Sequence, residues 1–128
     1  METLTHDPAD GIYPTTADYA HALELRDPRR LLLVSGTMGL DPGGAAGATL
    51  TEQVALIWSN LRTILASAGM TTDHVVRVTS YLRDAAYAEE NARARVEALG
   101  GRVVPTTAIV VETLEPDWLV EVEIIAAA

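Results

Sequence analysis

Two carboxylates near the C-terminal end of the chain, Glu121 and Glu123, are the residue pair best suited by type and spacing to do chemistry. They alternate with Val120, Val122 and Ile124, and this period of two predicts a strand with both carboxylates on one face. A carboxylate that is partly buried in a cleft has a raised pKa and can act as a general acid or base near neutral pH. We therefore expect a central strand that holds an acid at a defined place.

Other kinds of chemistry are excluded by residues that the chain lacks. It has no cysteine, so a thiolate nucleophile, a disulfide and a Cys-ligated metal are unavailable, and it has no lysine to form a Schiff base. His6, His21 and His74 share no metal-binding spacing. Ser35 lies in Val-Ser-Gly, which is not the nucleophile motif Gly-x-Ser-x-Gly. We expect neither a metal nor a cofactor.

The charge and hydropathy of the chain limit its partners. Its 128 residues, of which 48% are hydrophobic, suit one compact domain. The net charge is −9, which disfavours nucleic acid because sequence-independent binding needs a basic patch. The N-terminus lacks the basic and apolar regions of a secretory signal, and no apolar run approaches the roughly 20 residues of a membrane span. These features predict a soluble cytoplasmic protein without nucleic-acid or membrane partners.

The order of expected elements indicates an α+β domain. Residues 1–17 show turn residues without a sustained period and are expected to form an N-terminal arm, followed by the domain at 18–128. The periodicities predict strands at 19–25 and 31–34 joined as a hairpin, a helix at 50–68, a strand at 74–82, a helix at 85–99, and two strands within 102–128. The last two strands are expected to form an antiparallel pair around a turn at 114–117, with Glu121 next to Thr107 on the neighbouring strand. The order β-β-α-β-α-β-β predicts one sheet with two helices on one face.

The other face of this sheet is expected to remain apolar. Residues 31–34 and 108–111 and Ile125 offer apolar side chains to both sides of the sheet. A monomer would leave this patch in water, which soluble proteins rarely tolerate. The sequence therefore predicts a homo-oligomer packed through the open sheet face.

Several segments of the chain resemble the RidA (YjgF/UK114) family. They are Leu-Leu-Leu-Val-Ser-Gly at 31–36, the helix at 53–69, Val-Thr-Ser-Tyr-Leu-Arg-Asp at 78–84, Pro-Thr-Thr-Ala at 105–108 and Val-Glu-Val-Glu-Ile-Ile-Ala at 120–126. The likeness extends from about Tyr19 to the C-terminus. It implies a chorismate-mutase-like fold assembled as a homotrimer, with active sites in the clefts between subunits. The best-known members hydrolyse reactive enamines and imines to 2-keto acids and ammonia.

The resemblance also implies which residues form the site. In the family a glutamate on the last strand positions or activates water, and the matching residue here is Glu121. A tyrosine near the N-terminus and the backbone of a Ser-Gly pair complete the pocket, and the matching residues are Tyr19, Ser35 and Gly36. Asn91 matches a helix asparagine near the cleft.

One family position differs in this chain. The arginine that pairs with the substrate carboxylate follows the proline of the fifth strand, and Thr107 occupies that position here. Threonine replaces only one hydrogen bond of a bidentate arginine–carboxylate pair. Losing such an anchor costs roughly 2–5 kcal/mol of binding, so we expect poor deamination of free 2-imino acids. Arg102 is a candidate substitute, although an arginine after two glycines is more often a solvated loop residue.

Each candidate residue also has a structural interpretation. Glu121 can be a structural carboxylate bonded between subunits or a solvated residue, and Tyr19 can simply pack in the first strand. The hydroxyls of Thr106 and Thr107 would line a pocket for a neutral or carbonyl ligand, but strand propensity alone also explains them.

Two functions remain open from the sequence. The first is an enzyme of specialised metabolism that uses Glu121, with Tyr19 and Thr107, to hydrolyse, tautomerise or condense a small imine, enamine or related carbonyl compound. The second is a non-catalytic trimer that binds a small metabolite or docks on a pathway enzyme. Ribonuclease activity suits the acidic composition poorly.

Overall fold

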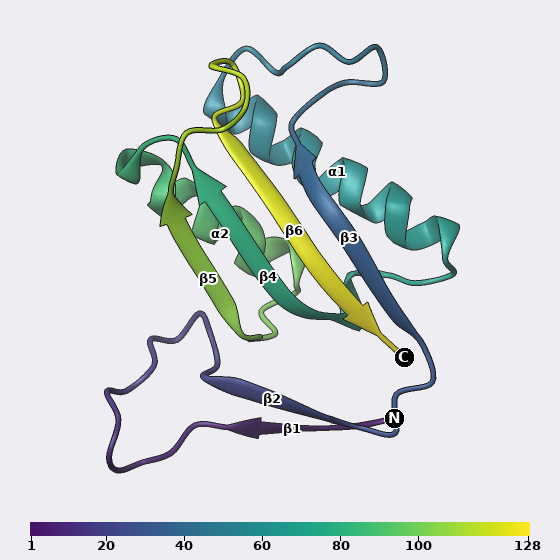
Figure 1. Ribbon diagram of the computed structural model, residues 1–128, viewed down its shortest axis with the longest axis vertical. Coiled ribbons are helices and arrows are strands. Elements are labelled where there is room, and N and C mark those ends of the chain that lie inside the picture. The colour runs from purple at the N-terminus through teal and green to yellow at the C-terminus, as the bar shows by residue number, and fades with distance from the viewer.

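The computed structural model describes residues 1–128 as a mixed α+β structure (Figure 1). Its strands are β1 (Glu2–His6), β2 (Ala22–Arg26), β3 (Leu31–Met38), β4 (Val75–Leu82), β5 (Thr106–Val110) and β6 (Val120–Ala127). Its α-helices are α1 (Leu50–Ser67) and α2 (Ala88–Ala98), and short 3₁₀ helices, η1 (Thr72–His74) and η2 (Ala85–Tyr87), precede β4 and α2. None of the helices has the length and apolar character needed to span a membrane.

The main sheet places the acid-bearing strand in its interior. Its strand order is β3-β6-β4-β5, in which β6 pairs antiparallel with both β3 and β4. The helices α1 and α2 lie together behind this sheet in the view of Figure 1. The expectation of a central final strand is therefore confirmed, as is the prediction of two helices on one face.

The predicted pairing of the last two strands is wrong. β5 pairs with β4 in parallel, whereas β6 lies between β3 and β4 and does not touch β5 in the sheet. The segment from β4 through α2 to β5 is a crossover, which parallel neighbours require. The turn residues at 114–117 thus belong to a longer connection that passes over the end of β4 before β6 begins.

The predicted N-terminal hairpin and the single sheet are also wrong. β2 pairs antiparallel with β1, a strand inside the predicted arm, and these two strands form a separate two-stranded sheet (Figure 1). The backbone turns between β2 and β3, where Asp27 adopts a φ of 52° immediately before Pro28. The chain changes direction at this left-handed residue, and β3 pairs with β6 and not with β2.

The helices pack through the apolar stripe that the sequence predicts. Thr49 caps α1 by accepting a hydrogen bond from Glu52 N at 3.2 Å, and Gly69 ends the helix with a φ of 69°. The core joins this stripe to the inward residues of β4 and β6 and to the segment before β5: Val54, Ile57, Trp58, Leu61, Leu65, Val75, Val78, Leu99, Val104, Val120, Val122 and Ile124. Burial of these side chains attaches the helical layer to one face of the sheet.

A buried glutamine ties the loops at one end of the sheet to α1. Gln53 is 2% exposed; its Nε2 donates to Gly47 O and Asp117 O, and its Oε1 accepts from Leu119 N. Gly39 lies so close to the Gln53 backbone that a Cβ there would clash. These contacts hold the connection that leads into β6 and so position the start of that strand.

The core contains one buried hydroxyl group without a hydrogen-bond partner. Ser80 on β4 is 1% exposed and its Oγ meets no donor or acceptor. An unpaired buried hydroxyl costs about 1–3 kcal/mol, so Ser80→Ala should raise the free energy of unfolding by up to about that amount. Urea unfolding measures it, and Ser59→Ala on the exposed face of α1 is the matched control, expected to change stability by less than about 0.5 kcal/mol. A destabilised Ser80→Ala variant would show that the hydroxyl has a partner in solution.

Candidate functional site

The sheet face opposite the helices gathers the polar side chains of the central strands. Strand alternation places Arg77, Thr79 and Tyr81 of β4 on this open face, together with Glu121 and Glu123 of β6. All five are half-buried, whereas their inward neighbours on both strands are buried. The open face is therefore a mixed polar and apolar surface whose charged groups are partly removed from water.

Glu121 lies against the backbone of β3. A Cβ added at Gly36 would clash with Glu121 Oε2 and lie 2.8 Å from Cδ, so the carboxylate covers the glycine. The β3–β6 register shifts between Val34 and Thr37, which brackets Gly36, and a bulge of this kind often lies beside a functional site. Burial, and secondly the charge of Glu123, raises the pKa of Glu121 above its ordinary value of 4.5.

Tyr81 and Glu123 form a second feature of the open face. The Tyr81 hydroxyl donates to Glu123 Oε1 at 2.5 Å. This hydrogen bond, followed by burial and the charges of the two glutamates, raises the pKa of Tyr81. The sequence analysis did not single out Tyr81, although the alternation of residues 75–82 would have placed it on the face of Thr79. The pair provides a phenol proton donor and a carboxylate two residues from Glu121.

Thr107 does not face Glu121 as a neighbour, contrary to expectation. β4 lies between β5, which carries Thr107, and β6, which carries Glu121. Thr79 of β4 is in register with Thr107 on β5 and with Glu123 on β6. The Thr107 hydroxyl instead accepts a hydrogen bond from Arg77 Nη2 at 3.0 Å. A guanidinium group therefore reaches the Thr107 position from the neighbouring strand.

Arg102, the substitute considered from sequence, is held elsewhere. Its Nη1 donates to Thr72 O and its Nη2 to Val75 O, both at 3.1 Å. These bonds direct the guanidinium to the backbone around η1 and the start of β4. Arg102 therefore serves the fold at that end of the sheet.

Two adjoining pockets share Glu123. One, of about 250 Å³, is lined by Tyr81, both glutamates and residues 111–114, which precede β6. Arg83 fixes this wall because its Nη1 donates to Thr113 Oγ1 at 2.8 Å. The other pocket, of about 220 Å³, is lined by Leu33, Val34, Arg77, Thr79, Glu123, Ile124 and Ile125. Acids, a phenol, hydroxyls and a guanidinium thus line one continuous stretch of the open face.

The remaining expected site residues are dispersed within one subunit. Ser35 and Gly36 line a pocket between the end of β3 and α1. Tyr19 precedes Ala20, which bridges to Pro105 at the start of β5, and its ring makes an edge contact with His21. Thr106 donates to Val104 O at 2.9 Å.

Asn91 lies in the helical layer. It is a 3%-exposed residue of α2 and packs behind the sheet, away from the open face. Within one chain, the structure therefore brings Glu121 and Gly36 together. It does not place Tyr19, Thr106, Thr107 or Asn91 beside them.

Sequence analysis also missed an ion pair that anchors the end of the predicted arm. Arg95 of α2 is 5% exposed; its Nη2 lies 2.8 Å from Asp18 Oδ2 and its Nη1 donates to Asp18 O at 2.6 Å. The hydrogen bond from Thr16, opposed by burial and aided by Arg95, lowers the pKa of Asp18. Arg95 has the helical spacing of Ala88, Ala92 and Leu99, and this was the available signal. The pair holds Tyr19 beside β5.

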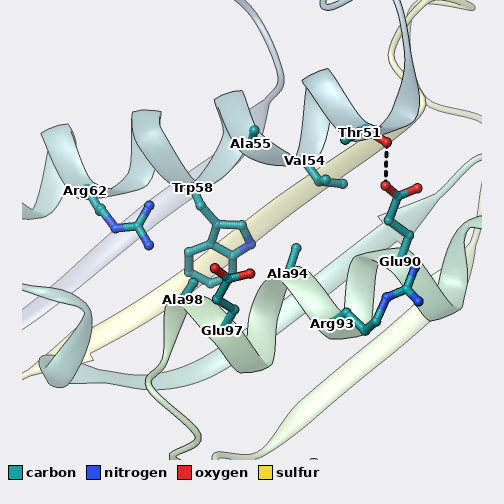
Figure 2. A pocket seen from close by; sticks show the side chains of 10 residues that line it. All are labelled: Thr51, Val54, Ala55, Trp58, Arg62, Glu90, Arg93, Ala94, Glu97 and Ala98. Carbon is teal, nitrogen blue, oxygen red and sulfur yellow. Dashed lines mark hydrogen bonds between the residues drawn. The ribbon is translucent and has the colours of Figure 1, made fainter.

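A larger groove in the helical layer has a different character. It measures about 400 Å³ and lies between α1 and α2, with Trp58 in its wall (Figure 2). Thr51 Oγ1 donates to Glu90 Oε1 at 2.6 Å across one end of it. The groove contains none of the expected site residues. The chemistry of the side chains, and not the volume of the cavity, therefore identifies the open sheet face as the candidate site.

No group of three or more histidine, aspartate or glutamate side chains is arranged to hold a metal ion. The candidate site therefore consists of ordinary acid, phenol, hydroxyl and guanidinium groups.

Comparison with known proteins shows relatives over nearly the whole chain. RutC family protein PH0854 of Pyrococcus horikoshii is 29% identical over 97 residues, which cover 74% of this chain and 77% of the relative. A solved structure of the Rid-family protein YyfB from Yersinia pestis, described as of unknown function, superposes with a TM-score of 0.84 at 27% identity, covering 100% of both chains. Rv2704 of Mycobacterium tuberculosis, a member of the YjgF/YER057c/UK114 family, matches with a TM-score of 0.67 at 28% identity over 86% of each chain.

A sequence profile gives the family directly. The profile described as Endoribonuclease L-PSP matches residues 12–128. RidA from the Antarctic bacterium Psychrobacter has the same fold, with a TM-score of 0.73 at 22% identity over the full length of both chains. The chain therefore belongs to the Endoribonuclease L-PSP family, which is the RidA (YjgF/YER057c/UK114) family.

Proposed function

We propose that this protein acts on a small imine, enamine or related carbonyl compound by general acid–base catalysis or water activation at Glu121. The observation that carries the proposal is the placement of Glu121, which is half-buried against Gly36 in a pocket with Glu123 and Tyr81. Burial raises the pKa of the Glu121 carboxyl, and a base is most effective when its pKa approaches the working pH. The family is generally linked to enamine and imine deaminase activity, which agrees with this chemistry.

The reaction needs only groups that the pocket contains. As a carboxylate, Glu121 accepts a proton from water while the oxygen attacks the carbon of the protonated imine, which gives a carbinolamine. The protonated acid then donates this proton to the nitrogen. The C–N bond breaks, ammonia or an amine leaves, and the Glu121 carboxylate takes the hydroxyl proton as the carbonyl product forms. The Tyr81 hydroxyl donates its proton to Glu123, so its oxygen is left as a hydrogen-bond acceptor for the substrate in the same pocket. Tautomerisation uses the same acid and base without the addition of water.

We further propose that the active form is a homotrimer packed through the open faces. Leu31 and Leu33 of β3 are 60% and 74% exposed in the single chain. Ile109 of β5 is 46% exposed on the same face, in register with Tyr81. Packing these side chains between copies removes them from water, excludes solvent from Glu121, and lets Tyr19 of one copy approach the acid of another.

A non-catalytic metabolite-binding trimer is the second candidate function. The threonine at position 107 favours it, because the family arginine that would anchor a 2-imino acid is missing there. Ligand binding without turnover of any imine or enamine by the wild-type protein would select this alternative.

Restoring the family arginine should change the substrate range. We expect Thr107→Arg to raise kcat/KM for 2-iminopropanoate by at least about tenfold, since a charged anchor contributes roughly 2–5 kcal/mol and 1.4 kcal/mol is a factor of ten. Coupled detection of the ammonia released measures the rate. Ala108→Arg adds the same charge to the opposite face of β5 and should leave the rate unchanged. Equal rates for Thr107→Arg and wild type would mean that the pocket differs from the family in more than this residue.

A further inference from the structure

Trp58 of α1 carries a hydrogen-bond donor that the protein leaves unpaired. The residue belongs to the core and is only 4% exposed. Its Nε1–H group has no acceptor within the protein, yet it is not sealed from solvent, because Ser80 Oγ is the one fully buried side-chain atom that lacks a partner. An indole nitrogen can only donate, and the N–H group of a buried tryptophan usually finds an acceptor. The Trp58 donor is therefore available to a ligand.

This donor opens into the groove between α1 and α2. In Figure 2 the indole nitrogen lies on the side of the ring that faces Ala94, away from Arg62, in the wall of the groove. The volume of about 400 Å³ lies within the range of roughly 300–1,000 Å³ that is typical of small-molecule sites. Because the helices lie behind the sheet in Figure 1, assembly through the open sheet face leaves the groove accessible.

The charges of the groove indicate a neutral ligand. Two arginines and two glutamates line it, so their formal charges cancel: Arg62, Arg93, Glu90 and Glu97. Glu90 is half-buried and already accepts a hydrogen bond from the Thr51 hydroxyl, whereas the other three are exposed. Exposed charges are solvated and screened, so they contribute little to the binding of a ligand ion. The free polar group that the buried wall of the groove presents is the neutral N–H of Trp58, which suits a neutral acceptor.

The apolar lining of the groove suits a small molecule better than a protein. It consists of Val54 and small side chains beside the indole ring: Ala55, Ala94 and Ala98. The large hydrophobic residues that are exposed in this chain all lie outside the groove. A protein partner would need a wide apolar surface, which the groove does not offer. A compact apolar body with one polar group can lie on the alanines and reach the indole nitrogen.

We propose that the groove between α1 and α2 binds a small neutral carbonyl compound, such as an amide, lactam or ketone. Its carbonyl oxygen accepts the hydrogen bond of Trp58 Nε1, and its apolar body lies against Ala94 and its neighbours. This site is separate from Glu121, and it depends neither on imine chemistry nor on the trimer.

NMR of protein labelled with ¹⁵N in its indole rings tests this inference, with benzamide as the probe. The chain has two tryptophans, and the indole resonance that remains in Trp118→Phe belongs to Trp58. Benzamide at millimolar concentrations should move the Trp58 indole proton downfield in a saturable way, because this proton becomes bonded to a carbonyl oxygen. The Trp118 resonance should stay in place. Benzoate and benzylamine have a similar size but opposite charges, and each should bind at least fivefold more weakly.

Filling the groove should abolish this binding. Ala94→Leu places a larger side chain in the groove and should weaken the binding of benzamide at least tenfold. Ala66→Leu makes the same change at an exposed position of α1 outside the groove and should bind like wild type. If circular dichroism shows that Ala94→Leu is not folded, Ala55→Leu on the facing wall provides the same test.

Three results would each overturn the inference. They are the absence of a saturable Trp58 shift up to 20 mM benzamide, an unchanged affinity in the groove-filling variant, and benzoate or benzylamine binding as tightly as benzamide.

Discussion

Replacing Glu121 by glutamine should reduce kcat/KM for imine or enamine hydrolysis by about 10²–10³-fold, within the range typical of a positioned acid or base. Glutamine keeps the size and one acceptor of glutamate, so the packing against Gly36 is retained while the proton-accepting carboxylate is lost. Measured rates for wild type and Glu121→Gln decide the matter. Glu97→Gln, an exposed α2 residue, is the control and should not change the rate. Equal rates for wild type and Glu121→Gln would remove Glu121 from the mechanism.

The position of this carboxylate can be tested separately from its charge. A Cβ at residue 36 would clash with Glu121 Oε2, so Gly36→Ala should push the carboxylate out of its place while leaving it ionisable. Activity should fall in this variant as well, mainly through kcat, because the base is misplaced relative to the bound substrate. Full activity in Gly36→Ala would show that the position over β3 has no catalytic importance.

The pH dependence of Glu121→Gln supplies a second readout. The pKa of Glu121 is raised in the folded protein, so the folded state binds more protons than the unfolded state between the ordinary value of 4.5 and the raised value. The free energy of unfolding of wild type therefore falls as pH increases through this window, and the substitution removes that loss. The difference in the free energy of unfolding between Glu121→Gln and wild type should therefore favour the variant more at pH 7 than at pH 4. Urea unfolding of both proteins at both pH values measures this difference. Wild-type kcat/KM should rise with pH as Glu121 ionises.

A charge on the open face should dissociate the proposed trimer. Ile109→Glu or Leu31→Glu would place three carboxylates in the interface, where burying an unpaired charge costs several kcal/mol per copy. Light scattering after size exclusion should show the mass falling from three times the 13.7 kDa subunit to one. Activity should be lost with assembly, because water then reaches Glu121.

The matched control for this prediction is the next residue of the same strand. Val110 is 57% exposed, slightly more than Ile109, but it is in register with Leu82, which faces the helices. Val110→Glu should therefore leave the oligomer intact. A monomeric wild-type protein, or equal dissociation by both substitutions, would contradict assembly through the open face.

Local spacing was sufficient to predict most of the elements. The capping pair at Thr49 and Glu52, the apolar period of 50–68 and the alternation of 120–126 each depend on residues close in sequence, and the structure has a helix or strand at each. The same period of two also predicts that Glu121 and Glu123 lie on one face of the strand. Only the β1 strand at the N-terminus had no such signal, because Leu4 is its single apolar residue.

Strand pairing required the tertiary structure. A short turn near 114–117 is compatible with a hairpin, but α2 connects β4 to β5 as a parallel crossover and leaves the place beside β4 to β6. This pairing depends on how the apolar faces of α1, α2 and the strands fill one core, which is a long-range property. The wrong hairpin led directly to the wrong expectation that Thr107 and Glu121 are neighbours.

The sequence by itself therefore determined the family, the element types and the acid on the final strand. The tertiary structure decided which side chains meet: Glu121 with Gly36, Tyr81 with Glu123, and Arg77 with Thr107. The physical reason is that residue type and period act within a few positions, whereas these three contacts join residues that are 30 or more positions apart in sequence and lie on strands that are adjacent only in the sheet.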